Sequence, residues 1–167
     1  MSATAVGVYT HVHSYNFVTN QLLNSVKEIV RMSGLDPAKM SGQWASLELG
    51  IHTWLADGDL ESVYLEIYNS RTDKLVRRWD FDISYSKSGD GSFWQDPDDI
   101  RYHIEKAGLN PANCDYEILT TTAPGRRNVA GWSRCSPRST DGFVKQSIGT
   151  TIGAGGISSG TSYWREK

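Results

Sequence analysis

The sequence is poor in cysteine and has no long apolar run. Only two of its 167 residues are cysteines, Cys114 and Cys135, and their spacing fits neither a metal site nor a redox motif. We expect two free thiols, although a disulfide stays open because both lie near strand-like segments. No apolar run approaches the length of about 18 residues that spans a membrane, and no basic and apolar leader precedes a cleavage site. A cytoplasmic protein that does not enter membranes is therefore expected.

A large excess of charge of one sign is missing as well. The chain has 17 Lys and Arg against 19 Asp and Glu, a formal charge of −2. Broad binding to nucleic acid or to a membrane surface would favour a basic excess. Four arginines gather around Trp132 in residues 124–138, and such a mixture can bind single-stranded nucleic acid. In an acidic protein it is more typical of a solvated loop or of the rim of a protein contact, so direct nucleic-acid binding is not expected.

Motifs for catalysis are also absent from the sequence. There is no G-x-S-x-G turn, and no Ser or Cys stands in a recognisable nucleophile motif. His11 and His13 form a His-x-His pair without a third ligand nearby, and His52 and His103 fall in other predicted elements. We therefore expect no catalytic residue, no cofactor and no metal.

The densest group of acids lies between Asp80 and Asp99. Paired carboxylates there could hold Mg²⁺ or Ca²⁺, but the spacing of an EF-hand is missing after Asp90. The acids of residues 96–99 suit the start of a helix, where they cap it and face its positive end. Asp80 and Asp82 alternate with apolar residues and are expected on a solvent-exposed face. A small metal-dependent hydrolase that uses the Asp80–Asp99 acids is the alternative hypothesis.

Apolar periodicity is present, and it changes along the chain. Apolar residues recur at helical spacing over 13–33 and 36–56 and alternate over 60–86, which predicts two helices and then a long β-hairpin. An Asp-Pro start predicts a third helix over 96–108, and the Thr-rich residues 115–123 predict another strand. This order predicts one α+β domain, with three helices packed on one face of a mainly antiparallel sheet.

The segment QSIGTTIGAGGISSGTSYW, residues 146–164, has no charged residue. A phosphate-binding loop would need a following helix and usually a lysine, and both are missing. A disordered tail would not be expected to carry evenly spaced isoleucines or to end in Tyr-Trp. We predict two β segments, 146–154 and 160–166, separated by a flexible 155–159. The glycines would let this segment pair with the sheet in more than one way.

Many stretches of the chain, taken in order, are similar to one known family. They are FVTNQLLNSVKEIVRMSGLDP, GIHTWLADGDLESVYLEIYN, TDKLVRRWDFDISY, GDGSFW, IRYHIEKAGLNP, TTTAPGR, GW, RSTDGFVKQSIGTT and SYWRE. From about residue 9 to the end, the chain resembles the bacterial HORMA-domain proteins found beside cGAS-like nucleotidyltransferases in anti-phage operons. The resemblance depends on order and extent, because no single stretch is a signature.

The resemblance implies a HORMA-like fold and a non-enzymatic switch. A C-terminal segment, the safety belt, would wrap over a short closure-motif peptide that adds to the sheet as a strand. The closed form would bind and activate a cGAS-like synthase of cyclic oligonucleotides, and an AAA+ remodelling ATPase would reopen it. Capture of this kind uses main-chain hydrogen bonds for affinity and side-chain pockets for specificity.

Carried over residue by residue, the resemblance implies one domain over 1–167, with a mobile start at 1–9 and a belt from about 124 to 167. The implied peptide-binding residues are Tyr116, Ile118, Thr120, Trp132, Phe143, Ile148, Thr150, Ile152 and Tyr163. For Phe143, Ile148 and Tyr163, ordinary core packing remains open as well. The implied contact of the remodeller consists of Ser2, Ala3, Thr4, Ala5, Val6, Gly7 and Val8.

Overall fold

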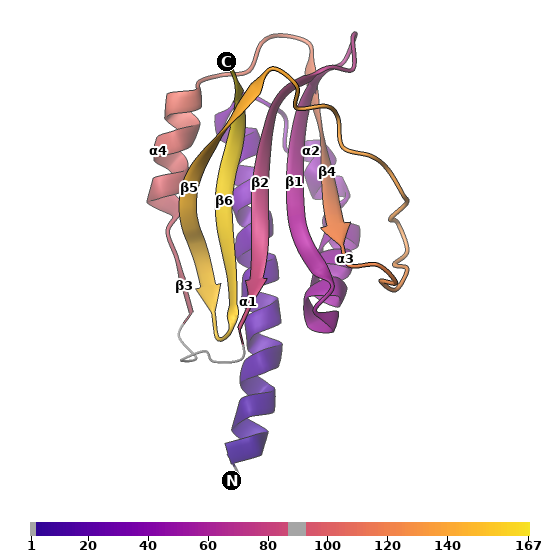
Figure 1. Cartoon of the computed structure of the whole chain (residues 1–167), viewed down its shortest axis with the longest axis vertical. Helices are drawn as coiled ribbons and strands as arrows, with labels where there is room; N and C mark the ends of the chain where they lie inside the picture. The colour runs from indigo at the N-terminus through magenta and orange to yellow at the C-terminus, as the bar shows by residue number, and fades with distance from the viewer. Residues whose placement is uncertain (1–2, 87–92) are drawn as a thin grey trace.

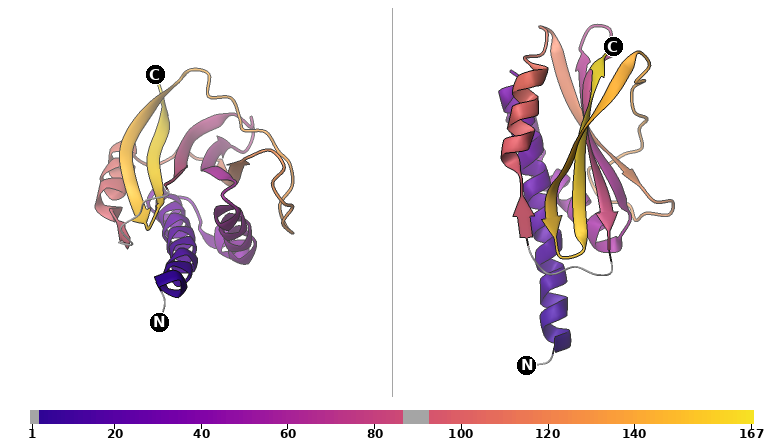
Figure 2. Two further views of the ribbon diagram at one scale, coloured as in Figure 1. Left: turned by 60° about the horizontal axis from the view of Figure 1, so that its bottom comes forward. Right: turned by 60° about the vertical axis from the view of Figure 1, so that its left-hand side comes forward.

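The fold has two layers, a six-stranded sheet and a layer of helices on one of its faces (Figure 1 and Figure 2). The computed structural model describes residues 3–86 and 93–167, and the elements are those of this part of the chain. The helices are α1 (Ala3–Met32), α2 (Ala38–Gly42), α3 (Trp44–Asp57) and α4 (Pro97–Ala107). The strands are β1 (Leu60–Asn69), β2 (Leu75–Tyr85), β3 (Phe93–Gln95), β4 (Cys114–Thr122), β5 (Phe143–Ala154) and β6 (Ile157–Glu166).

The first helix is longer than the apolar pattern predicts. α1 begins at Ala3, and its first turns extend beyond the sheet (Figure 1). The sequence of these turns contains no regular apolar stripe, which is why the periodicity places the start of the helix near residue 13. Residues 3–9, which were expected to form a mobile start, are helical in the structure. Residues 1–2 lie outside the described part. None of the described helices is both long and apolar enough to span a membrane.

The predicted second helix is divided into α2 and α3. Gln43 separates them, with a φ of −102° and a ψ of 2° that leave the helical region. Gly42 precedes the break and weakens a helix at this point. Asp36 accepts a hydrogen bond from the N–H of Ala38 at 2.9 Å, as a residue at a helix start should. Gly58 ends α3 with a φ of 76°, a left-handed conformation that glycine adopts without strain.

The predicted third helix is confirmed as α4. Asp96 caps it by accepting the N–H of Asp99 at 3.1 Å, and Pro97 stands in the first turn. Ile100 and Ile104 form its buried face.

All strand pairs of the sheet are antiparallel, in the order β3-β5-β6-β2-β1-β4. β1 and β2 form the predicted hairpin, in which Leu65 lies opposite Trp79. β4 pairs with the other side of β1, and β6 pairs with the other side of β2. The first hairpin therefore lies inside the sheet, with β4 on one side of it and the C-terminal strands β6 and β5 on the other. The short strand β3, next to β5, has no sequence pattern that predicts it.

The uncharged C-terminal segment is a β-hairpin, as its pattern predicts, with a shorter turn than expected. β6 begins at Ile157, so only Gly155 and Gly156 connect it to β5. Gly156 has a φ of 101°, and a Cβ there would lie 2.7 Å from the carbonyl oxygen of Ser86. Only glycine fits this turn without displacing the chain. The predicted flexible residues Ser158 and Ser159 are instead part of the strand.

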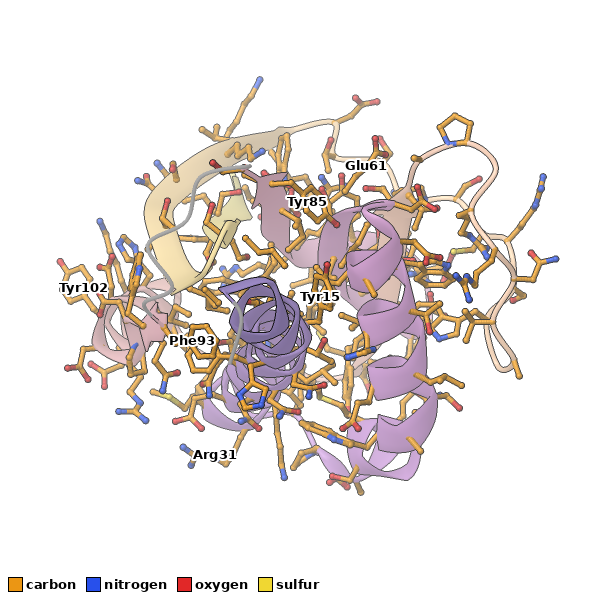
Figure 3. The ribbon with its side chains drawn as sticks, turned by 90° about the horizontal axis from the view of Figure 1, so that it is seen from below. Tyr15, Arg31, Glu61, Tyr85, Phe93 and Tyr102 are labelled. Carbon is orange, nitrogen blue, oxygen red and sulfur yellow. The ribbon has the colours of Figure 1, made fainter. Side chains whose placement is uncertain are left out.

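The apolar core lies between the helices and the inner face of the sheet. Seen from below, α1 lies between α4 and α3, with Tyr15 toward α3 and Phe93 toward α4 (Figure 3). Tyr15 meets His52 of α3 edge-on at 6.2 Å, and Phe17 packs on Phe93 at 5.0 Å between ring centres. The largest fully buried side chains include Trp54, Trp79, Tyr163, Phe81 and Leu22.

The outer face of the sheet holds a buried ion pair. Asp80 is only 1% exposed, and Arg78 donates to its two carboxylate oxygens at 2.7 and 3.0 Å. The indole N–H of Trp164 donates to Asp80 at 3.0 Å, and the Arg78 guanidinium lies 4.0 Å from the centre of the Tyr64 ring. The expectation that Asp80 faces solvent is wrong, because the neighbouring strand β6 brings Trp164 over it. Asp82 is half-buried.

Candidate functional site

β4 forms one edge of the sheet and leaves part of its backbone without a strand partner. The N–H of Ala123 donates to the carbonyl of Asp59 at 2.8 Å, so the odd-numbered residues of β4 turn their backbone groups toward β1. By the alternation of an antiparallel ladder, Ile118, Thr120 and Thr122 turn theirs outward. Within residues 3–86 and 93–167, no backbone group pairs with these outward groups. An edge of this kind can accept a further strand.

One end of this edge is closed by side chains. The ammonium of Lys39 donates to the carbonyl of Tyr116 at 2.7 Å, and the Asp115 carboxylate accepts the N–H of Tyr116 at 2.8 Å. The Tyr116 ring turns inward, where its hydroxyl donates to the carbonyl of Asp36 at 2.7 Å and accepts from the N–H of Met40 at 3.1 Å. Burial raises the pKa of the Tyr116 hydroxyl. The open part of the edge therefore begins at Ile118.

Residues 123–142, called here the crossing segment, connect β4 to β5 and bow outward beside β4 (Figure 1). Trp132 attaches this segment to α3. Its indole N–H donates to the carbonyl of Ser46 at 2.8 Å, and its ring meets Trp54 edge-on at 5.1 Å. A Cβ on Gly50 would lie 2.2 Å from the indole nitrogen of Trp132. Glycine at this position of α3 is therefore what allows the indole to lie against the helix.

A second attachment lies nearer the end of β4. Arg127 forms a two-bond ion pair with Asp57 of α3, with N–O distances of 2.6 and 2.7 Å. The carbonyl of Arg127 accepts the indole N–H of Trp54 at 2.9 Å, and the Arg126 guanidinium lies over the Trp54 ring at 4.6 Å. Val129 is buried in the core. The first half of the crossing segment is thus held chiefly by α3, with Val129 in the core and the Ala123 N–H bonded to Asp59.

A third attachment, at Arg138, joins the far end of the crossing segment to the outer face of the sheet. Its guanidinium donates to Glu66 at 2.9 Å, to Glu117 at 3.0 Å and to Asp73 at 2.8 Å, and it stacks 3.6 Å above the Tyr68 ring. Glu66 has no exposed surface. Burial alone would lower the pKa of Arg138, but the hydrogen bonds to these carboxylates outweigh burial and raise it. The ion pairs therefore hold Arg138 charged and in place.

A cavity of about 620 Å³ lies between the open edge of β4, the start of the α2–α3 layer and the crossing segment. β4 contributes residues between Glu117 and Thr122, the helices contribute Lys39 and Gln43, and the crossing segment contributes residues from 123 to 135. Backbone donors and acceptors thus face a half-open space, which the crossing segment bounds on the side away from β4. This geometry suits a short extended chain that pairs with β4.

A sequence model of the family described as bacterial HORMA domain 2 matches residues 3–167. The chain belongs to this family. No curated protein sequence matches it.

Solved HORMA structures share its fold at low sequence identity. A chain of the mitotic checkpoint complex has a TM-score of 0.76 at 11% identity, covering 94% of this chain and 97% of its own. C. elegans HTP-1 bound to the HIM-3 closure motif has a TM-score of 0.73 at 15% identity, covering 91% and 89%. The E. coli MS115-1 complex of CdnC with HORMA-deltaN has a TM-score of 0.65 at 14% identity, covering 93% and 89%. The predicted α+β HORMA fold is therefore confirmed.

The nine residues predicted to bind a peptide separate into two groups in this HORMA domain. Ile118, Thr120 and Trp132 line the cavity, and Tyr116 stands at the closed end of the edge with its ring in the core. The other five lie on β5 and β6: Phe143, Ile148, Thr150, Ile152 and Tyr163. In the sheet, β2 and β1 separate these strands from β4. The structure does not bring these five to the cavity, because the hairpin pairs with β2 and does not cover β4.

The predicted handle for a remodeller lies at the far end of α1. Ala3, Thr4, Ala5, Val6, Gly7 and Val8 form its first turns, and Ser2 lies outside the described residues. The acids of the alternative hypothesis have other partners: Asp80 pairs with Arg78, and Asp96 caps α4. Asp90 lies outside the described residues. Residues 3–86 and 93–167 contain no group of three or more His, Cys, Asp or Glu side chains that could hold a metal.

Sequence reasoning missed Lys39 and Glu66 and did not assign Arg138 its partners. Arg138 belongs to the arginine-rich stretch that was interpreted as a solvated loop or a contact rim, and its exposed fraction is only 15%. Its contact with Glu66 joins residues 72 positions apart. No local pattern of the sequence indicates the contacts of Lys39 or Glu66. The alternation of β1 predicts only that Glu66 faces away from the core. Cys114 and Cys135 are both free thiols.

Proposed function

We propose that this protein is a non-enzymatic signalling switch that captures a closure-motif peptide as an extra strand on β4. Ile118 and Thr120 would pair with the peptide through their backbone, and Trp132 would help to cover it. In the loaded, closed form the domain would bind and activate a cGAS-like synthase of cyclic oligonucleotides in anti-phage defence. An AAA+ ATPase would reopen it.

The observation that carries the proposal is that the outward backbone groups of Ile118, Thr120 and Thr122 line the cavity and have no backbone partner among the described residues. A captured peptide would give these groups the partners that an inner strand has. At about 3.4 Å per residue, the open part of the edge accommodates a peptide strand of about five residues. The HTP-1 structure, whose chain has this fold, is bound to a closure motif, which supports the same role here.

In this proposal the crossing segment moves when a peptide enters or leaves. Three attachments, at Arg127, Trp132 and Arg138, hold it over the cavity. A covered peptide would therefore leave slowly unless these contacts are broken together, which gives a remodelling ATPase a task. The first turns of α1 extend beyond the body of the domain (Figure 1), which supports their assignment as the handle of the remodeller.

The partner synthase is proposed from the family and from one neighbour. The E. coli HORMA chain of the same fold forms a complex with CdnC, and the anti-phage setting is implied by the resemblance of the sequence. We assign no catalytic role to any residue of this chain.

A matched pair of substitutions at Thr120 tests strand addition directly. Its N–H faces outward, so Thr120→Pro removes a donor that β1 does not use and places a ring where the peptide backbone would lie. Thr120→Val keeps the N–H and a side chain of similar size. Peptides selected on the wild-type protein from a random display library are measured by fluorescence polarisation. We expect at least tenfold weaker binding to Thr120→Pro and a change of less than about threefold for Thr120→Val.

The same pair of variants separates capture from activation. With the cognate synthase present, the peptide-loaded wild type and Thr120→Val should raise the yield of cyclic product, and Thr120→Pro should not. Hydrogen exchange at Ile118 to Thr122 adds a direct readout, because captured peptide should slow it in the wild type. Equal peptide binding by both variants, with no slower exchange on β4, would contradict the strand-addition model.

A further inference from the structure

The charges around the cavity do not balance. Four charged side chains line it: Lys39, Glu117, Arg126 and Arg134. Lys39 already pairs with Asp115 at 3.2 Å, and Glu117 already pairs with Arg138 at 3.0 Å. Two arginines are left, and neither forms an ion pair with any acid among residues 3–86 and 93–167. The cavity therefore has an excess of positive charge, although the protein as a whole is acidic.

Both arginines have donors available for a ligand. Arg126 is held over the Trp54 ring and uses one nitrogen to donate to the carbonyl of Arg127 at 3.2 Å. Arg134 is exposed, two positions beyond Trp132, which fixes the backbone of this part of the crossing segment. A guanidinium has five N–H groups in a planar fork, so each arginine can bind a carboxylate through two parallel hydrogen bonds.

The crossing segment places these arginines on the cavity that contains the open backbone of β4. On the basis of the proposed function, we propose that the captured peptide is acidic. An aspartate or glutamate side chain of the peptide pairs with Arg126 or Arg134 while the peptide backbone pairs with Ile118 to Thr122.

Other ligands fit these observations less well. A basic peptide would bring like charges beside two arginines that have no acid of their own, which weakens binding. An uncharged peptide would cover the guanidinium groups and remove water without supplying an acceptor of equal strength. The phosphates of a nucleic acid accept hydrogen bonds but donate none, so its regular backbone cannot pair with the outward carbonyls of β4 as a peptide strand does. A peptide strand with a carboxylate satisfies the carbonyls, the amides and the arginines together.

The experiment selects peptides from a random twelve-residue display library on the full chain. Its comparison variant is the double substitution Arg126→Gln with Arg134→Gln, which removes both charges and keeps polar side chains. Arg71→Gln is the control, because Arg71 is exposed in the turn between β1 and β2, at the opposite end of the edge strand from Thr122. The pools recovered on the wild type and on Arg71→Gln should be enriched in Asp and Glu over the starting library, and the pool recovered on the double variant should not.

Binding of single peptides then tests the pairing itself. For a peptide recovered on the wild type, replacing its acid by the matching amide should weaken binding about fivefold to the wild type and less than twofold to the double variant. Raising NaCl from about 50 to about 500 mM should weaken the acidic peptide more than its amide form.

The outcomes distinguish this inference from the proposed function beneath it. Tight binders without acidic residues would overturn the charge preference and leave peptide capture in place. Acidic enrichment that persists on the double variant would overturn the assignment to Arg126 and Arg134. If no peptide slows hydrogen exchange on β4 at all, the proposed function fails, and the charge preference fails with it.

Discussion

The two parts of the chain that follow β4 are attached to the domain in different ways. The hairpin β5–β6 pairs with β2 through a continuous register, from Trp164 opposite Arg78 to Ile157 opposite Tyr85. It also contributes Ile152 and Tyr163 to the core. The crossing segment contains no strand and is held chiefly by the separate side-chain contacts of Arg127, Trp132 and Arg138.

This difference predicts how each part can move. Removing the hairpin would expose core side chains and the edge of β2, so its detachment approaches unfolding of the whole domain. Lifting the crossing segment breaks a few side-chain contacts and leaves the core mostly intact. Segments with few buried apolar contacts open at the low end of the stability scale. We infer that exchange of the proposed peptide begins with the crossing segment and not with the hairpin.

Tyr163→Ala should give the largest effect on stability. Tyr163 is 2% exposed and stacks on Trp79 at 4.6 Å between ring centres, so its removal leaves a cavity in the core. We expect the free energy of unfolding to fall by about 3–5 kcal/mol, measured by urea denaturation. Val144→Ala, at an exposed position of the same hairpin, should change it by less than about 0.5 kcal/mol. Faster hydrogen exchange confined to β5 and β6, with an unchanged urea midpoint, would mean that the hairpin detaches on its own.

Arg138→Ala should lower the free energy of unfolding of the domain less than Tyr163→Ala does. It should loosen the crossing segment more. In a rigid protein, leaving the fully buried Glu66 without its cation would cost about 3–5 kcal/mol. Here the segment can lift and let water reach Glu66, so the cost cannot exceed the free energy of opening. Hydrogen exchange in residues 124–138 should therefore accelerate at least tenfold, while global stability falls by about 1–2 kcal/mol.

Two further variants test whether the effect of Arg138→Ala arises from the unpaired charge of Glu66. Glu66→Gln keeps an acceptor for the Arg138 backbone N–H, which donates to Glu66 at 2.8 Å. In that background Arg138→Ala should cost less, because no buried charge is left unpaired. Arg134→Ala, at an exposed residue without an ion pair in the described part of the chain, should leave exchange unchanged. If Arg134→Ala accelerates hydrogen exchange in residues 124–138 as much as Arg138→Ala does, Arg138 has no special role in attaching the crossing segment.

The difference between the two parts also explains what the sequence could and could not predict. The hairpin is visible locally, because spaced isoleucines and a closing Tyr-Trp indicate strands and the glycine pair indicates a turn. The start of α4 is visible for the same reason, since Asp96 and Pro97 stand beside the helix that they begin. Such signals depend on neighbouring residues. These local signals are enough to predict the helices, the β1–β2 hairpin and the α+β class.

The covered cavity depends on contacts that no local pattern contains. Lys39 reaches Tyr116 across 77 positions, and Glu66 and Asp80 alternate with apolar residues as solvent-facing acids would. Glu66 is buried because Arg138 of the crossing segment lies against it, and Asp80 is buried because the Trp164 side chain of the neighbouring strand β6 covers it. Strand order decided where the remaining residues lie: because the hairpin pairs with β2, two strands separate Tyr163 on β6 from β4, and three separate Ile152 on β5 from β4. A pattern that predicts strands does not state which neighbour each strand takes.

Gly50→Ala should give the smallest change in global stability and still release the crossing segment. Alanine favours a helix over glycine by about 1 kcal/mol, so α3 itself gains. Its Cβ would lie 2.2 Å from the indole nitrogen of Trp132, so the indole must leave and lose its bond to Ser46. Gly153→Ala is the matched control, because a Cβ there would lie 2.3 Å from the indole nitrogen of Trp94 on β3. We expect exchange in residues 124–135 to accelerate only in Gly50→Ala, with both unfolding free energies within about 1 kcal/mol of the wild type. The stability gained in α3 and the stability lost at Trp132 nearly cancel, so an unfolding curve alone would miss the change. Only hydrogen exchange in the crossing segment distinguishes a segment that Trp132 anchors from one that merely lies against α3.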